Sequence, residues 1–194
     1  GVNSLLRLVE VAVPGPGAFT PVFFLVILSG HVFGARFGFL MGALTMAVSG
    51  VVTGGVGPWL PYQMLSAGWI GMTAGFLPGG GRSRVAPSRR EVRLLAIFGA
   101  AWGFGYGLLM TPWTWQVVGA GDGSGPAWAR FLSFYLATSL VWDAFGAAGT
   151  AVLFLVAGAP VLAALRRLGR WFAFTVEEGD PGTAPAVPAT PSPL

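Results

Sequence analysis

The chain has 194 residues, of which 54% are hydrophobic and 9% are charged. An ordinary globular domain carries about 25% charged residues, so this chain has too few to cover a surface that faces water. The net charge of +4 comes from 11 arginines without a lysine, and these lie at the ends of apolar segments rather than in one patch, which argues against nucleic acid as a partner. The absence of cysteine excludes disulfides and thiolate metal sites. We therefore predict an all-α, polytopic integral membrane protein.

The first apolar segment covers residues 2–13 and is short for a spanning helix. It contains Arg7 and Glu10, and the prolines and glycines at positions 14–17 end it. The chain starts at Gly1 rather than at Met, and it starts inside this segment. We therefore expect the end of a truncated first helix, in an N-terminally incomplete copy of a longer protein.

Five further spans are predicted where glycine, proline or charge interrupts the apolar runs, each compared with the roughly 20 residues that a spanning helix needs. They cover residues 19–33, 37–53, 61–77, 93–115 and 143–165. The run 128–165 is too long for one span, so residues 128–142 are expected to form an external or interfacial helical extension. Residues 171–194 lack periodicity and are predicted to be a disordered cytoplasmic tail behind a membrane domain of residues 1–170.

The arginines predict the orientation of these spans. The loop 78–91 contains four arginines, which places it in the cytoplasm under the positive-inside rule. Because successive loops must alternate between the two sides of the membrane, nine of the 11 arginines then lie on the inner side. Only Arg7 and Arg130 do not. Both termini of the complete protein are therefore expected in the cytoplasm, with the protein in the plasma membrane.

Small residues recur at a spacing of four in several spans. In lipid this spacing lets helix backbones approach closely, so internal helix packing is the favoured interpretation and contact with a partner membrane subunit is the alternative. The residues are Gly30, Gly34, Gly38 and Gly42, then Gly71 and Gly75, then Gly99, Gly103 and Gly107.

Aromatic and amide side chains gather at the predicted external ends of the spans. An interfacial belt explains many of them, whereas a flat ligand captured from outside would need such stacking surfaces and a few orienting polar groups. Arg7 and Asp143 lie at comparable depths and could either pair as a clamp or face a water-filled cavity, and Glu10 competes for the same role. The predicted ligand-binding residues are Arg7, Trp59, Tyr62, Gln63, Trp113, Gln116, Tyr135, Trp142 and Asp143.

Catalytic and metal-binding patterns are missing from the sequence. His31 is the only histidine, and an interfacial hydrogen bond is the favoured role for it. No carboxylate cluster, Ser–His pairing or phosphate-binding loop accompanies it. We therefore expect a protein that is not an enzyme and holds no cofactor.

Three segments carry a resemblance to a known family: GGVGPWLPYQM at residues 54–64, YGLLM at 106–110 and FYLATSLVWD at 134–143. Here the chain resembles the substrate-binding S components of energy-coupling factor (ECF) vitamin transporters, in the branch found in actinobacteria. The resemblance implies a six-helix bundle with both termini inside and an outward-facing ligand cavity. It also implies docking on a membrane coupling subunit driven by two ATPase subunits.

The resemblance makes cobalamin or a related corrinoid the leading substrate hypothesis, with riboflavin or a pyrimidine precursor as open alternatives. A structural or assembly membrane protein is the competing class of function. In that class the aromatic residues would only anchor the helices, and Arg7 would clamp to Asp143.

Overall fold

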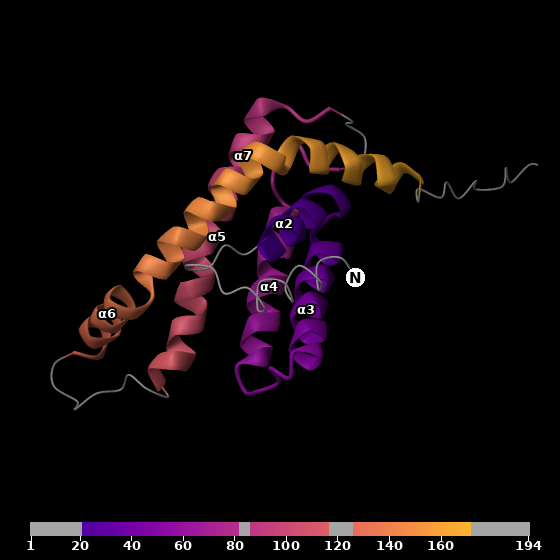
Figure 1. Ribbon diagram of the computed structural model, residues 1–194. Helices are drawn as coiled ribbons and strands as arrows, with labels where there is room; N and C mark the ends of the chain where they lie inside the picture. The colour runs from indigo at the N-terminus through magenta and orange to yellow at the C-terminus, as the bar shows by residue number, and fades with distance from the viewer. Residues whose placement is uncertain (1–20, 82–85, 117–125, 172–194) are drawn as a thin grey trace, which may run out of the picture.

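The computed structural model describes residues 21–81, 86–116 and 126–171 (Figure 1). These residues form six helices and no strand, which confirms the predicted all-α fold. In chain order the helices are α2 (Pro21–Phe33), α3 (Ala35–Val52), α4 (Leu60–Ala74), α5 (Arg89–Thr114), α6 (Ala127–Thr138) and α7 (Leu140–Trp171). Of these, α3, α5 and α7 are long and apolar enough to cross a membrane. The predicted partial helix at residues 2–13 lies outside the described residues.

Helix α2 lies at the centre of the molecule. It packs against α3, α4, α5 and α7, and its apolar side chains are buried nearly all round, including Val22, Val26 and Leu28. A helix that is hydrophobic on every face is expected to be surrounded in this way. Phe23 lies near the start of α2 and His31 near its end. The two ends of this helix therefore contribute side chains to two different regions of the molecule.

The turn between α2 and α3 lies at Gly34, two residues before the position predicted from Arg36. Gly34 has a φ of 94°, which glycine adopts without the steric cost that other residues meet. Arg36 instead lies in the first turn of α3, where it is exposed.

The small residues at spacing four pack helices together within the chain. A Cβ built on Gly38 would lie 2.2 Å from the carbonyl oxygen of Gly71, and one on Gly42 would lie 2.1 Å from that of Ala67. The backbones of α3 and α4 are therefore in direct contact. On α5, a Cβ on Gly103 would lie 2.8 Å from Cα of Ala147 in α7. Internal packing is thus confirmed for these residues.

Helix α5 begins at Arg89, four residues earlier than the predicted span. Ser88 caps it, because the Ser88 hydroxyl accepts a hydrogen bond from the Glu91 backbone N–H at 3.1 Å while the Glu91 carboxylate reaches back to the Ser88 backbone N–H. Such a capping box satisfies two backbone donors that a helix end leaves unpaired. The sequence Ser-Arg-Arg-Glu carries this signal.

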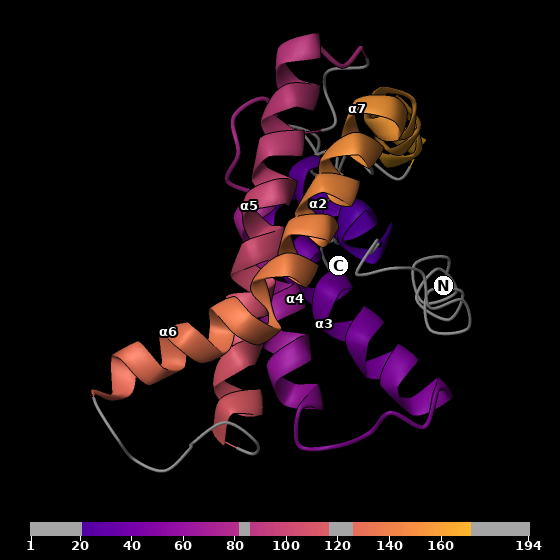
Figure 2. The same ribbon diagram turned by 60° about the vertical axis from the view of Figure 1, so that its left-hand side comes forward.

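The predicted extension before the last span is a separate helix, α6, which meets α7 at an angle (Figure 2). Ser139 separates the two. Helix α7 has 32 residues, which corresponds to about 48 Å at 1.5 Å per residue and exceeds the ~30 Å hydrocarbon core of a bilayer. It therefore contains the predicted span 143–165 and extends beyond it at both ends. Helix α7 bends along its length (Figure 1), and Pro160, which cannot donate to the helix ladder, lies inside it.

Candidate ligand-binding cavity

A cavity of about 290 Å³ lies where α5 and α7 cross. Helix α2 supplies one aromatic side chain to its wall, and the junction of α6 and α7 supplies hydroxyl groups. Its lining is mixed, with aromatic rings, hydroxyls, glycines and one carboxylate. The lining residues are Phe23, Gly103, Tyr106, Gly107, Met110, Thr111, Thr114, Thr138, Ser139, Trp142, Asp143, Gly146 and Thr150.

Asp143 is the acidic group of this cavity. It lies in the first turn of α7, where a negative charge interacts favourably with the helix dipole. Helix α5 makes room for it with a glycine, because a Cβ on Gly107 would lie only 2.0 Å from the Asp143 Oδ2 atom. The Tyr135 hydroxyl on α6 donates a hydrogen bond to the same oxygen at 2.9 Å. Burial and the neighbouring Asp143 raise the pKa of Tyr135 to about 12, so this hydroxyl keeps its proton at neutral pH.

Hydroxyl groups from α5, from the end of α6 and from the turn before α7 line the side of the cavity next to Asp143. The Thr111 hydroxyl donates to the Gly107 carbonyl at 2.7 Å, which satisfies it within α5. Its oxygen also lies 3.4 Å from the Ser139 hydroxyl, and Ser139 lies 3.3 Å from that of Thr138. These groups can both donate and accept hydrogen bonds, so they suit the neutral polar groups of a ligand.

Aromatic rings form the rest of the wall. The ring centroids of Phe23 and Tyr106 lie 4.7 Å apart, which joins α2 to α5 at the cavity. Trp142 lines the cavity while 54% of its surface remains exposed. A tryptophan held open in this way can stack on a flat ligand.

The structure brings some of the predicted site residues together and leaves others apart. Trp142 and Asp143 line the cavity, and Tyr135, which is not in the lining, donates a hydrogen bond to Asp143. Their role in ligand binding stays a prediction. Tyr62 and Trp113 contact each other, with ring centroids 5.8 Å apart, but neither lines the cavity. Trp59 and Gln116 are exposed at the ends of α4 and α5, and Gln63 is half-buried; these three also lie outside the lining. Arg7, and with it the predicted pair with Asp143, falls outside the described residues.

Residues 1–158 match the family model described as "ECF transporter, substrate-specific component". The chain belongs to this family. No curated protein and no solved structure matches it. S components are transport subunits rather than enzymes; they take a small-molecule substrate and work with a membrane coupling subunit and ATPase subunits. This multi-pass S component therefore acts in the plasma membrane.

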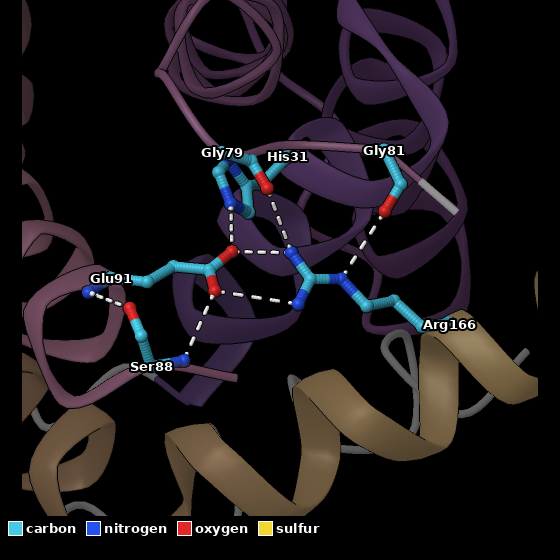
Figure 3. Close-up of polar contacts among 6 residues, drawn as sticks. All are labelled: His31, Gly79, Gly81, Ser88, Glu91 and Arg166. Atoms are coloured by element: carbon cyan, nitrogen blue, oxygen red, sulfur yellow. Dashed lines mark hydrogen bonds and ion pairs between the residues drawn. The ribbon is translucent and has the colours of Figure 1, made fainter. Parts of the chain in front are cut away.

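The opposite end of the S component holds a buried cluster of charged groups, shown in Figure 3. The Glu91 carboxylate accepts a hydrogen bond from Nε2 of His31 at 2.8 Å, and Arg166 donates to both of its oxygens through Nη1 and Nη2. The same guanidinium donates from Nε to the Gly81 carbonyl at 3.2 Å and from Nη2 to the Gly79 carbonyl at 2.9 Å. His31 thus forms a hydrogen bond, but the predicted interfacial position is wrong, because His31 is buried and its partner Glu91 lies inside the protein.

This cluster is fully enclosed by protein: Arg166 is 0% exposed and His31 is 2% exposed. It joins α2, α5 and α7 to the loop after α4 (Figure 3). Because the Arg166 guanidinium, the His31 imidazole and a backbone N–H converge on one carboxylate, the Glu91 charge is compensated by Arg166 without a ligand. Across the described part of the chain, no group of three or more His, Cys, Asp or Glu residues could hold a metal ion.

Proposed function

We propose that this S component captures a vitamin or a vitamin-like compound in the cavity between α5 and α7 and delivers it for ATP-driven uptake. The observation that carries the proposal is the convergence of Trp142, Asp143 and the α5 hydroxyl groups on one cavity in a chain of this family. Aromatic rings would hold a flat ligand, hydroxyls would bond its neutral polar groups, and Asp143 would orient it.

The proposed orientation puts this cavity on the external side. Helix α5 begins with Arg89, Arg90 and Arg93, and α7 ends with Arg166, Arg167 and Arg170. Both arginine-rich ends belong on the cytoplasmic side under the positive-inside rule. The cavity is lined by the opposite ends of the same two helices, from Gly103 onward in α5 and up to Thr150 in α7. The chain after α7 would then lie in the cytoplasm, as predicted for the tail at 171–194, which apart from its first residue lies outside the described residues.

The identity of the vitamin stays a prediction. Cobalamin or a related corrinoid, and the actinobacterial type of S component, are the hypotheses that the sequence resemblance supports. The cavity of about 290 Å³ lies at the lower end of the ~300–1,000 Å³ typical of ligand pockets. A corrinoid exceeds this volume, so it would also have to contact residues outside this lining, and smaller vitamins fit the cavity without that requirement.

The test combines ligand identification with uptake. The full-length protein is purified and its co-purified small molecules are identified by mass spectrometry, and uptake of that compound is measured in cells that co-express the coupling subunit and ATPases. We expect one vitamin-like compound to co-purify and to enter cells only when the complete transporter is present. Absence of any bound vitamin, together with no uptake across a panel of vitamins, would favour a structural or assembly role instead.

A further inference from the structure

Asp143 differs from every other group in the described lining because it is a carboxylate that meets no cationic side chain among the described residues. No arginine or histidine belongs to the described lining. The one hydrogen bond that its carboxylate makes with the described residues comes from the neutral Tyr135 hydroxyl, which donates a hydrogen bond but supplies no charge. Glu91, by contrast, contacts the Arg166 guanidinium and the His31 imidazole. Among the described residues, one carboxylate therefore has a cationic partner and the other has none.

An unpaired carboxylate near the end of a membrane span is costly, and such groups usually face a cavity and find a partner there. A cation is the partner that stabilises such a carboxylate most, because a charge-assisted hydrogen bond is stronger than a neutral one. The wall next to Asp143 suits a cation as well. Trp142 precedes it in the chain and lines the same cavity, and tryptophan is the side chain whose ring face attracts a cation most strongly.

The size of the cavity and the rest of its lining limit the ligand further. A volume of about 290 Å³ admits one or two small rings. The Phe23 and Tyr106 rings give a second aromatic surface, and the Thr111 and Ser139 hydroxyls can bond neutral polar substituents.

From these features we propose that the cavity selects a compact heteroaromatic compound that carries a positive charge, with its charged nitrogen paired to Asp143 and its ring against Trp142. The proposal rests on the proposed function and specifies its substrate class. Anionic vitamins of the same size would be excluded by repulsion from Asp143. A corrinoid would not be the ligand of this cavity.

The test uses three probes that share a ring and differ in charge: benzamidinium, benzamide and benzoate. Binding to the purified full-length protein is measured by calorimetry, in competition with any co-purified ligand. We expect benzamidinium to bind about tenfold or more tighter than benzamide, and benzoate to bind least, because a bond to a charged group is worth more than a neutral one. In Asp143→Asn, which keeps the shape but removes the charge, benzamidinium should lose this advantage. Ser133→Ala, on the exposed face of α6, is the control and should keep it.

A second variant covers the case in which Asp143→Asn does not fold, which thermal unfolding of the purified protein would reveal. Trp142→Leu removes the ring face, so it should weaken benzamidinium binding severalfold and leave benzoate unchanged. Equal affinities for the three probes, no binding of benzamidinium, or a preference for benzoate would overturn the proposal. So would a cation preference that persists in a folded Asp143→Asn variant.

These outcomes are separable from the fate of the proposed function. If the transporter takes up a neutral or anionic vitamin and Asp143→Asn leaves that uptake intact, the substrate class is wrong and the transport function stands. If benzamidinium is preferred but no vitamin is bound or transported, the cationic site stands and the transport function is wrong.

Discussion

The two polar regions of this S component surround a carboxylate in opposite ways, because Glu91 is buried and Asp143 is only half-buried. At the end that carries most of the arginines, Glu91 accepts hydrogen bonds from His31, Arg166 and the Ser88 backbone N–H. At the opposite end, the Asp143 carboxylate receives one neutral hydroxyl among the described residues and lines a cavity. Compensated charge joins helices together, whereas uncompensated charge beside an open volume is suited to binding. The difference separates a structural cluster from a candidate site within one bundle.

The largest expected effect comes from removing the buried Arg166 cation. Arg166→Met should leave Glu91 buried with one partner fewer and destabilise the protein by about 3–5 kcal/mol, the cost of breaking a buried ion pair. Arg167→Met, at the exposed neighbouring position, should change stability by less than about 0.5 kcal/mol. Thermal unfolding in detergent compares the two. Equal stability of both variants would show that the cluster around Glu91 does not hold the helices together.

A smaller effect is expected where α5 and α7 touch between the two regions. Gly103→Ala places a methyl group 2.8 Å from the backbone of Ala147, which cannot move without shifting α7. Overpacking of this kind costs about 1–3 kcal/mol. Gly105→Ala on the same helix meets only the Trp102 ring at 3.1 Å and should cost less. The two unfolding curves would coincide if the helices were separated more widely than described.

Ligand affinities of variants can show whether the ligand binds in the cavity or at the aromatic pair of Tyr62 and Trp113. Trp142→Ala should weaken binding of the co-purified ligand about tenfold or more, because the ring that stacks on the ligand is lost. Trp113→Ala removes a ring that packs on Tyr62 outside the cavity and should change the dissociation constant by less than about threefold. If calorimetry showed that Trp113→Ala weakens ligand binding more than Trp142→Ala does, the binding site would lie at the pair of Tyr62 and Trp113 instead.

The smallest effect concerns the bond that holds Asp143. Tyr135→Phe keeps the ring and removes one hydroxyl donor, so it should destabilise the fold by about 1 kcal/mol. Because the Tyr135 pKa is raised to about 12, the hydroxyl stays protonated at lower pH, and this difference should not change between pH 6 and pH 9. Unfolding measurements at both pH values check it. A difference that disappears at pH 9 would mean that Tyr135 ionises much earlier.

The sequence predicted the fold well because membrane helices are limited by simple rules of length and hydrophobicity. It placed the spans 37–53 and 61–77 close to α3 and α4, and it separated residues 128–142 from the last span. It missed the break at Ser139, which divides that extension from α7. No local pattern marks Ser139 as a helix end.

Prediction of the site was partial for a physical reason. Trp142 and Asp143 stood out because a charge and an aromatic ring at the end of an apolar run are conspicuous. Thr111 and Ser139 did not, because hydroxyl side chains are common in membrane helices and their convergence depends on how α5 crosses α7. The pairing of Glu91 with Arg166 spans 75 residues, and the positive-inside rule treated Arg166 only as a surface charge. The buried Arg166 guanidinium donates hydrogen bonds to the carbonyl groups of Gly79 and Gly81, and only the tertiary structure brings these carbonyls next to it.

The most direct test measures how much vitamin-like ligand co-purifies with the full-length protein, as the molar ratio of ligand to protein determined by mass spectrometry. It compares the unmodified chain with a Trp142→Ala, Asp143→Asn double variant. We expect close to one ligand per protein in the unmodified chain and almost none in the folded double variant. Equal occupancy in the two proteins would contradict it, because the ligand would then be held somewhere other than the cavity between α5 and α7.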